Sequence, residues 1–288
     1  MNRRQSLILL TAVFGSRNAF CSEEKKPGTT IKRPLMGTLF SITCHHPDGS
    51  VVAKAIDAAF AEAEKINACA SDYIADSELL SLSKKPVGTA VTLSPLLFKL
   101  VAEAHDFAEK TDGAFDPTLG PLTKLWRESR RRKKLPDPGT LAAAKAASGW
   151  KHLLLDPEKS TATFTVPGMR LDLGGIAKGQ AADIMLAALK SRGVSSASVT
   201  AGGDVRVGDP PPDEEGWKIG VRTFDKENDS ATLVLNNAAV STSGSLQQTV
   251  EIDGVRYAHI IDPATGLGLT KDVAACIVSP TSSLSDAL

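Results

Sequence analysis

The feature that most constrains this chain is a glycine-rich turn that connects a short apolar run to a helix. Residues 171–173 read LDL and predict a short strand, which continues into the turn GGIAKG. The next segment, QAADIMLAALKSRG, has the apolar spacing of a helix that ends at Gly193. SASVTAGGDV then predicts a strand. Backbone N–H groups at the start of a helix attract anions, so with Lys178 this turn is a candidate phosphate site, although such turns are more often structural only.

Other segments also mix strands and helices. LFSITCHH predicts a strand, and residues 51–67 repeat apolar side chains at helical spacing. A further helix is expected from Ser94-Pro95, a capping hydroxyl followed by proline, to Gly113. TVEIDGVRYAHII predicts a hairpin, because Asp253-Gly254 suits a tight turn with positive φ. The irregular alternation favours an α+β fold over a doubly wound parallel sheet.

The charge balance argues against a nucleic-acid partner. Lysine plus arginine and aspartate plus glutamate each total 33, so the chain has no overall basic character. The one basic run is RESRRRKK at residues 127–134, which is followed by Pro136 and Pro138. We interpret this run as a solvated loop.

The N-terminus has the pattern of an export signal. Basic MNRR precedes the apolar run SLILLTAVF, which is too short for a stable membrane-spanning helix. We therefore predict a signal peptide over residues 1–21, a linker over 22–32 and one domain over 33–288. A twin-arginine signal, a lipid-modified Cys21 and a membrane anchor are weaker alternatives. Three cysteines remain, and their number and spacing indicate neither a disulfide framework nor a zinc site.

Three further segments contain groups suited to catalysis. TAGGDV brings Asp204 to a second glycine turn, and GAFDPTLGPLTKLW offers Asp116 and Thr118 beside prolines that stiffen the loop. YAHIIDPATG puts His259 at the end of the predicted hairpin, three residues before Asp262. A histidine at such a junction is equally consistent with a structural hydrogen bond and with a general base.

The order of these segments resembles that in one family. MGTLFSI, SDYIADSEL, GAFDPTLGPLTKLW, LDLGGIAKGQAAD, TAGGDV, VSTSG and AHIIDPATG follow one another as in the ApbE-type FAD:protein FMN transferases. The resemblance covers roughly residues 33–288. It implies an α+β, T-fold-related architecture of antiparallel sheets and packed helices.

The resemblance also implies an activity and a set of site residues. Members of the family are exported, magnesium-dependent enzymes that split FAD and attach its FMN half to a threonine or serine of a target flavoprotein, releasing AMP. By similarity, His259 is the candidate base. The implied FAD contacts are Met36, Tyr73, Ala114, Phe115, Asp116, Asp172, Lys178, Gly202, Gly203, Asp204, Ile260 and Thr265.

A metal site is implied at the end of the chain, which reads SLSDAL. The family has an Asp-Ala-x-x-Thr motif on a helix, and its aspartate and threonine bind Mg²⁺ together with a backbone carbonyl of the glycine turn. Asp286 matches the aspartate and Ala177 the carbonyl, but the threonine would lie beyond Leu288. We therefore expect a truncated family member that lacks the helix carrying both side chains.

Two other functions stay open. An FAD pyrophosphatase of the same fold would release free FMN and AMP. A non-catalytic exported protein would hold FAD unchanged, and the missing metal ligand makes this alternative stronger here than in a full-length relative, while the transferase remains the leading hypothesis. The expected partners are FAD and an acceptor flavoprotein, and any membrane association would be through an N-terminal anchor alone.

Overall fold

The computed structural model describes residues 28–222, 230–245 and 248–288. The predicted signal peptide and Cys21 lie outside these residues. β1 begins at Thr29, so the end of the predicted linker, residues 29–32, forms part of the folded domain. None of the helices described here is long and apolar enough to cross a membrane.

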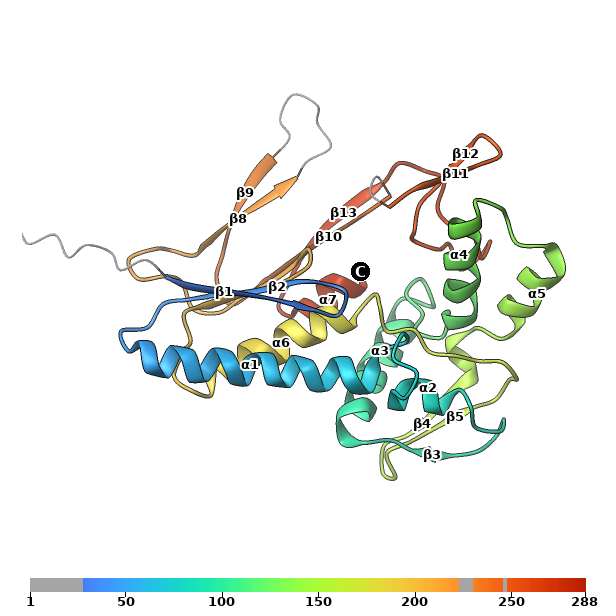
Figure 1. Ribbon diagram of the computed structural model, residues 1–288, viewed down its shortest axis with the longest axis horizontal. Helices are drawn as coiled ribbons and strands as arrows, with labels where there is room; N and C mark the ends of the chain where they lie inside the picture. Colours follow the sequence, from blue (N-terminus) through green and yellow to red (C-terminus); the bar gives the residue numbers. More distant parts are fainter. Residues whose placement is uncertain (1–27, 223–229, 246–247) are drawn as a thin grey trace, which may run out of the picture.

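A six-stranded antiparallel sheet forms the larger part of the fold (Figure 1). Each neighbouring pair of strands is antiparallel, as the sequence predicted for an α+β fold. Glycines close the turn between its two central strands, where Gly202 has a φ of +72°. In spatial order the strands are β1 (Thr29–Leu35), β2 (Thr38–Cys44), β6 (Ala197–Ala201), β7 (Asp204–Val207), β10 (Ala239–Gly244) and β13 (Ala274–Ser279).

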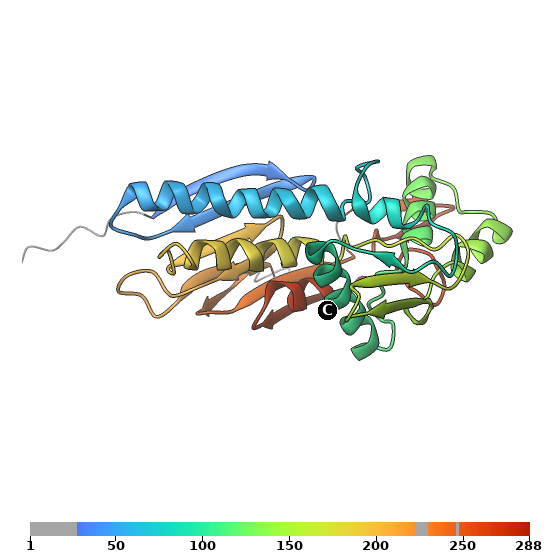
Figure 2. The ribbon, with the colours of Figure 1, turned by 90° about the horizontal axis from the view of Figure 1, so that it is seen from below.

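Helices α1 (Gly49–Ala70) and α6 (Ala177–Lys190) run side by side along one face of this sheet (Figures 1 and 2). The apolar positions predicted for the first helix are all buried in α1, which supports the 3.6-residue pattern. Together with inward-facing strand residues such as Phe40 and Ile42, they form the main core. Short helix α7 (Ser282–Ala287) packs beside α6.

Smaller elements gather at one end of the sheet layer (Figure 2). They include a three-stranded sheet and four helices, of which α3 begins at the predicted Ser94 cap. Two hairpins complete the fold, and the one turning at Asp253-Gly254 matches the sequence prediction. The bounds are α2 (Glu78–Leu82), α3 (Pro95–Lys110), α4 (Gly120–Arg132), α5 (Pro138–Ala146), the 3-10 helix η1 (Trp150–His152), β3 (Val91–Thr92), β4 (Leu153–Asp156), β5 (Thr161–Phe164), β8 (Trp217–Arg222), β9 (Ser230–Leu235), β11 (Val250–Ile252) and β12 (Val255–Tyr257).

Two of the secondary-structure predictions made within the domain are wrong. Among the described residues, 171–173 pair with no strand, and the ladder contact next to them is an isolated bridge between Leu119 and Arg170. Leu171 and Leu173 instead fill the core as part of a segment without regular secondary structure. The basic run is no loop, since α4 continues to Arg132 and ends at Lys133, which has a left-handed φ of 52°. The helix forms because Trp126 and Leu122 bury its apolar face.

Candidate active site

Lys178, at the start of α6, lies between two buried carboxylates. Its Nζ is 2.9 Å from Asp286 Oδ1 on α7 and 3.0 Å from Asp204 Oδ2 at the start of β7. A lysine in the first turn of a helix faces the positive end of the helix dipole, so the two carboxylates offset an otherwise unfavourable charge. The glycine turn, the second glycine turn and α7 therefore meet at one point.

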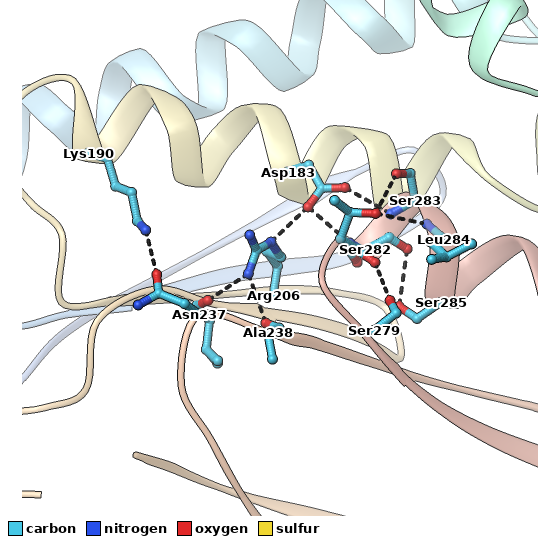
Figure 3. Close-up of polar contacts among 12 residues, drawn as sticks. Asp183, Lys190, Arg206, Asn237, Ala238, Ser279, Ser282, Ser283, Leu284 and Ser285 are labelled. Carbon is cyan, nitrogen blue, oxygen red and sulfur yellow. Dashed lines mark hydrogen bonds and ion pairs between the residues drawn. The ribbon is translucent and has the colours of Figure 1, made fainter. Parts of the chain in front are cut away.

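Helices α6 and α7 cap each other. Asp183 of α6 accepts hydrogen bonds from the backbone N–H groups of Ser282 (2.9 Å) and Ser283 (2.8 Å) in the first turn of α7 (Figure 3). Asp286 of α7 accepts one from Gly179 N (3.0 Å) in the first turn of α6. Each helix thus satisfies backbone donors that the other leaves open.

This exchange explains why a six-residue helix is stable. Nucleation makes so short a helix unfavourable in isolation, because its few internal hydrogen bonds do not offset the cost of ordering the backbone. Contacts with other parts of the fold supply the missing stabilisation. Besides the cap from Asp183, the hydroxyls of Ser285 and Ser241 lie 3.0 Å apart, and Ser283 Oγ donates to Glu103 Oε1 (2.6 Å). The helix expected to be absent is therefore present over Ser282–Ala287, and it carries Asp286.

Gly179 permits this close approach of the two helices. A Cβ at this position would lie 2.2 Å from Ser282 O and 2.8 Å from Ser283 Cα, both of them backbone atoms. Non-bonded heavy atoms do not approach a Cβ this closely, so a larger residue would push α7 away. The glycine in AKG consequently has a packing role in addition to any role in binding an anion.

Burial shapes the protonation of this cluster. Burial raises the pKa of Asp286, the nearby Asp204 charge raises it further, and Lys178 acts in the opposite direction. Burial alone would lower the pKa of Lys178, but Asp286 and Asp204 outweigh it and raise that pKa. The lysine is therefore held as a cation beside carboxyl groups that have little access to water.

A second cluster surrounds Arg127 of α4. Its guanidinium forms an ion pair with Asp72, and its Nη2 donates to Asp172 Oδ2 at 2.8 Å. The same group lies over the ring of Tyr73, with Cζ 4.6 Å from the ring centroid. Burial raises the pKa of Asp72, the Asp172 charge adds to this, and Arg127 opposes it. Tyr73 and Asp172 were predicted site residues, whereas Arg127 and Asp72 were missed.

Asp116 organises the loop before α4. Its Oδ1 accepts hydrogen bonds from Thr118 N (2.7 Å) and Thr118 Oγ1 (2.6 Å), and its Oδ2 accepts one from Trp150 N (3.0 Å). Burial raises the pKa of Asp116, and these hydrogen bonds oppose the rise. Pro117 O accepts a hydrogen bond from Asp172 N (2.8 Å), so this loop lies directly against the glycine turn.

The remaining predicted contacts lie around these clusters. Met36 has a φ of 51° in the turn between β1 and β2 and packs against the core, and Ala114 and Phe115 precede Asp116 in its loop. A Cβ on Gly175 would lie 3.5 Å from the Phe115 ring, so Phe115 also faces the glycine turn. Gly202 and Gly203 form the turn that leads into Asp204.

His259, Ile260 and Thr265 belong to the loop that follows β12. This loop rests on α4 and α5, because Trp126 Nε1 donates to Ala258 O (3.0 Å) and Lys145 Nζ donates to Ala264 O (2.6 Å). Leu269 N donates to Ile260 O at 2.8 Å, which folds the loop back on itself. Helix α4 thus supports both the Arg127 cluster and the segment that carries the candidate base.

Comparison with known proteins identifies the family. A model described as the ApbE family matches residues 36–288. The chain belongs to the ApbE family. Its membership confirms the resemblance predicted from the motifs.

Relatives of this ApbE chain share both sequence and fold with it. The FAD:protein FMN transferase of Vibrio cholerae is 31% identical over 250 residues, covering 85% of this chain and 74% of the relative. That of Treponema pallidum is 35% identical over 229 residues, covering 74% and 63%. The ApbE protein of Thermotoga maritima has a TM-score of 0.81 at 30% identity, covering 90% of this chain and 84% of that chain. The apo flavinyl transferase ApbE of Pseudomonas stutzeri has a TM-score of 0.81 at 26% identity, covering 90% and 82%.

Proposed function

We propose that this ApbE chain transfers the FMN half of FAD to a threonine or serine hydroxyl of an acceptor flavoprotein and releases AMP. The observation that carries the proposal is Lys178, held between Asp204 and Asp286 at the glycine turn. The activity named for relatives at 31% and 35% identity supports it. The acceptor is defined only by its chemistry, an accessible hydroxyl beside a flavin-binding surface.

The reaction is a phosphoryl transfer. The acceptor oxygen attacks the phosphorus of the FMN half, the bond from that phosphorus to the bridging oxygen breaks, and the bridging oxygen leaves with AMP. The hydroxyl proton passes to a base. Such reactions depend mainly on positioning and on neutralising charge around the phosphates. Lys178 supplies a cation of raised pKa at the start of a helix, where an anion is favoured.

His259 is the proposed base. It is partly buried in the loop after β12, which α4 supports through Trp126. An imidazole takes up a proton near neutral pH, which suits deprotonation of a hydroxyl during attack. The proposed FAD contacts lie in the Asp116 loop, the Arg127 cluster, the two glycine turns and the β12 loop, with Met36 at the edge.

The charge and chemistry of the Lys178 cluster fit a divalent metal. Asp204 Oδ2 is buried, and its polar contact among the described residues is the ion pair with Lys178 Nζ at 3.0 Å. Asp286 is one residue from the end of α7, and Ala177 begins α6. In the described part of the chain, no three His, Cys, Asp or Glu side chains are grouped to hold a metal. Mg²⁺ commonly binds one or two carboxylates together with substrate phosphates, so this donor set is compatible with it.

The metal would be held by Asp286 and the Ala177 carbonyl, with Asp204 nearby. Bound there, it would neutralise charge on the phosphates as the bond to AMP breaks. Lys178 would then be released from Asp286 and available to the substrate. We also propose that the protein acts outside the cytoplasm, on the basis of the MNRR and SLILLTAVF segments that precede the domain.

The test incubates the full chain with FAD, Mg²⁺ and a protein fragment containing an acceptor threonine. Mass spectrometry measures the FMN adduct on the fragment, and chromatography measures AMP and free FMN. We expect adduct and AMP in equal amounts, and loss of both with His259→Ala or with EDTA. His152→Ala is the matched control, because His152 is an exposed histidine whose ring contacts Thr165 and is not among the proposed FAD contacts.

Other outcomes distinguish the alternatives. AMP and free FMN without adduct identify a pyrophosphatase, and FAD that stays intact with Mg²⁺ present identifies a binding protein. A chain that flavinylates equally well in EDTA contradicts the metal part of the proposal only. Adduct formation by His259→Ala contradicts the role of the base.

A further inference from the structure

The arginines in the basic run at the end of α4 make different contacts. Arg130 donates to a backbone oxygen just before β11, whereas Arg127 pairs with carboxylates of two other segments. Arg131 and Arg132 have side chains 75% and 72% exposed and pair with Glu128 on the same helix. Arg127 is 36% exposed and reaches away from α4 to the segment after α1 and to the glycine turn. Arg127 therefore connects three separate parts of the candidate site.

The guanidinium of Arg127 makes three contacts at once. It forms the ion pair with Asp72, donates to Asp172 Oδ2 and stacks on the Tyr73 ring. A planar group with several N–H donors can make all of these contacts together, whereas an ammonium is a single point charge. The contact therefore depends on the shape of arginine as well as its charge.

The two carboxylates are held close together by this arginine. The side chains of Asp72 and Asp172 are 9% and 8% exposed, so their mutual repulsion is poorly screened by water. Asp72 is anchored through Arg170 Nη2, which donates to its backbone oxygen (2.8 Å), and Asp172 through Gly174 N, which donates to Oδ1 (2.8 Å). Without Arg127 the like charges would separate, and the segment carrying Tyr73 would move.

Tyr73 is arranged as a stacking surface. Tyr73 follows Asp72 in the chain and is 75% exposed, and the Arg127 guanidinium lies over its ring. A large exposed aromatic ring supported from behind by a cation is suited to stack on a planar ligand. The isoalloxazine and adenine rings of FAD are both planar ligands of this kind.

We propose that Arg127 is a positioning residue for FAD. It backs the Tyr73 ring and holds Asp172 in place, so that the protein presents a preformed stacking surface beside the glycine turn. The inference rests on the proposed function, because it requires FAD as the ligand. It adds Arg127 of α4 to the residues proposed to act on FAD. By fixing the Tyr73 ring in advance, Arg127 would lower the entropy cost of ordering the site when FAD binds.

The test compares Arg127→Gln with Arg131→Gln, which removes an exposed arginine from the same helix. Calorimetry measures the Kd of the full chain for FAD, FMN and AMP, and the transfer assay measures KM and kcat. We expect Arg127→Gln to weaken FAD binding and raise KM about tenfold, with kcat changed less than about threefold. Either FMN or AMP should show the same loss of affinity in Arg127→Gln. The ligand that does so contains the ring that stacks on Tyr73. Arg131→Gln should match the wild type.

Two more variants separate positioning from general stability. Arg127→Lys keeps a charge and is expected to fold, yet it should still bind FAD several-fold more weakly, because an ammonium cannot pair with both carboxylates and stack. In a Tyr73→Leu background, Arg127→Gln should have little additional effect on FAD affinity. If Arg127→Gln does not fold, the lysine variant decides the question.

Some results would overturn the inference. Unchanged FAD affinity in Arg127→Lys shows that charge alone is sufficient, and equal affinities for Arg127→Gln and Arg131→Gln show that Arg127 does not position the ligand. Fully additive losses in the Tyr73→Leu background would separate Arg127 from the tyrosine. Failure of the wild type to bind FAD is a different result, which refutes the proposed function itself.

Discussion

The Lys178 and Arg127 clusters solve the same electrostatic problem with different side chains. Each places one cation between two carboxylates that are less than a tenth exposed. Lys178 bridges the ends of two regular elements, α7 and β7, and Asp286 also caps α6. Arg127 bridges irregular segments, and its planar group makes a stacking contact as well.

The difference shows what each cation can contribute to the site. A lysine between rigid elements is a compact charge that can be exchanged for another cation or directed to a phosphate without moving the backbone. An arginine that joins loops fixes the loops themselves. We infer that the Lys178 cluster serves charge neutralisation and that the Arg127 cluster serves ligand shape.

The largest expected effect is that of Lys178→Met. Removing one partner of a buried ion pair leaves the other charges unpaired, so the free energy of unfolding should fall by about 3 kcal/mol, and transfer activity should fall at least about a hundredfold. Urea unfolding and the transfer assay measure the two effects. Lys190→Met in the same helix is the control, because Lys190 is exposed and binds Asn237 at the surface. Equal stability of the two variants would show that the carboxylates tolerate the loss of their cation.

Gly179→Ala tests whether the Lys178 cluster depends on contact between the helices. The added Cβ would overlap the backbone of Ser282, so we expect α7 to shift and stability to fall by about 2 kcal/mol, despite the better helix propensity of alanine. Thermal unfolding measures this. Gly49→Ala is the matched control, because a Cβ there meets nothing within 4 Å and should leave the protein as stable or slightly more so. A stable Gly179→Ala protein would contradict the close packing of α6 and α7.

The pH dependence of Asp72 tests the Arg127 cluster. Burial and the Asp172 charge raise its pKa in the folded protein. A raised folded pKa contributes stability below the unfolded pKa and loses it as pH rises through the folded value. The wild type should therefore be more stable relative to Asp72→Asn at about pH 3 than at about pH 7, by about 1.4 kcal/mol for each unit by which the two pKa values differ.

Urea unfolding of both proteins at several pH values measures this difference. Asp57→Asn, which removes an exposed carboxylate paired with Arg33, controls for the loss of one negative charge. If the wild type instead gains stability over Asp72→Asn as pH rises, the ionised form of Asp72 is favoured in the folded protein. Its attraction to Arg127 would then outweigh its burial and its repulsion by Asp172. That outcome would make the Arg127 cluster a conventional salt bridge.

The smallest expected effect is that of Arg131→Gln. Its ion pair with Glu128 is at the surface, where such pairs contribute little, so the free energy of unfolding should change by less than about 0.5 kcal/mol. The same urea experiment measures it. A larger loss would mean that the basic run stabilises α4 as a group, and the distinction between Arg127 and its neighbours would then be weaker.

Local patterns predicted much of the fold. The apolar spacing of α1, the Ser94-Pro95 start of α3 and the Asp253-Gly254 turn depend on neighbouring residues alone, and the structure agrees with each. Residues 171–173 were predicted to form a strand because apolar and polar side chains alternate there. A strand also needs a neighbouring strand to pair with, and the described residues offer a single bridge, at Arg170. We predicted a loop for the basic run because it is rich in charged residues and is followed by prolines. The helix forms because Leu122 and Trp126, which precede most of the run, are buried against the rest of the fold.

Sequence motifs also pointed to part of the candidate site, but contacts between distant segments were not predictable from them. Motif order pointed to Lys178, Asp204 and Asp286, and these three meet in the structure. No pattern pointed to Arg127 or Asp72, because their contacts join residues 45 and 55 positions apart. The helix at the chain end was also unexpected, because its stability comes from Asp183, about a hundred residues earlier.

The sequence by itself determined the family, the antiparallel α+β class and most of the regular elements, because these follow from side-chain periodicity, turn residues and motif order. Only the tertiary structure decided which charges are buried together, that α6 and α7 cap each other, and that Arg127 supports Tyr73. The physical reason is that the energy of a charge depends on its loss of water and on the groups around it. Both are set by segments that are distant in the chain and adjacent only after folding.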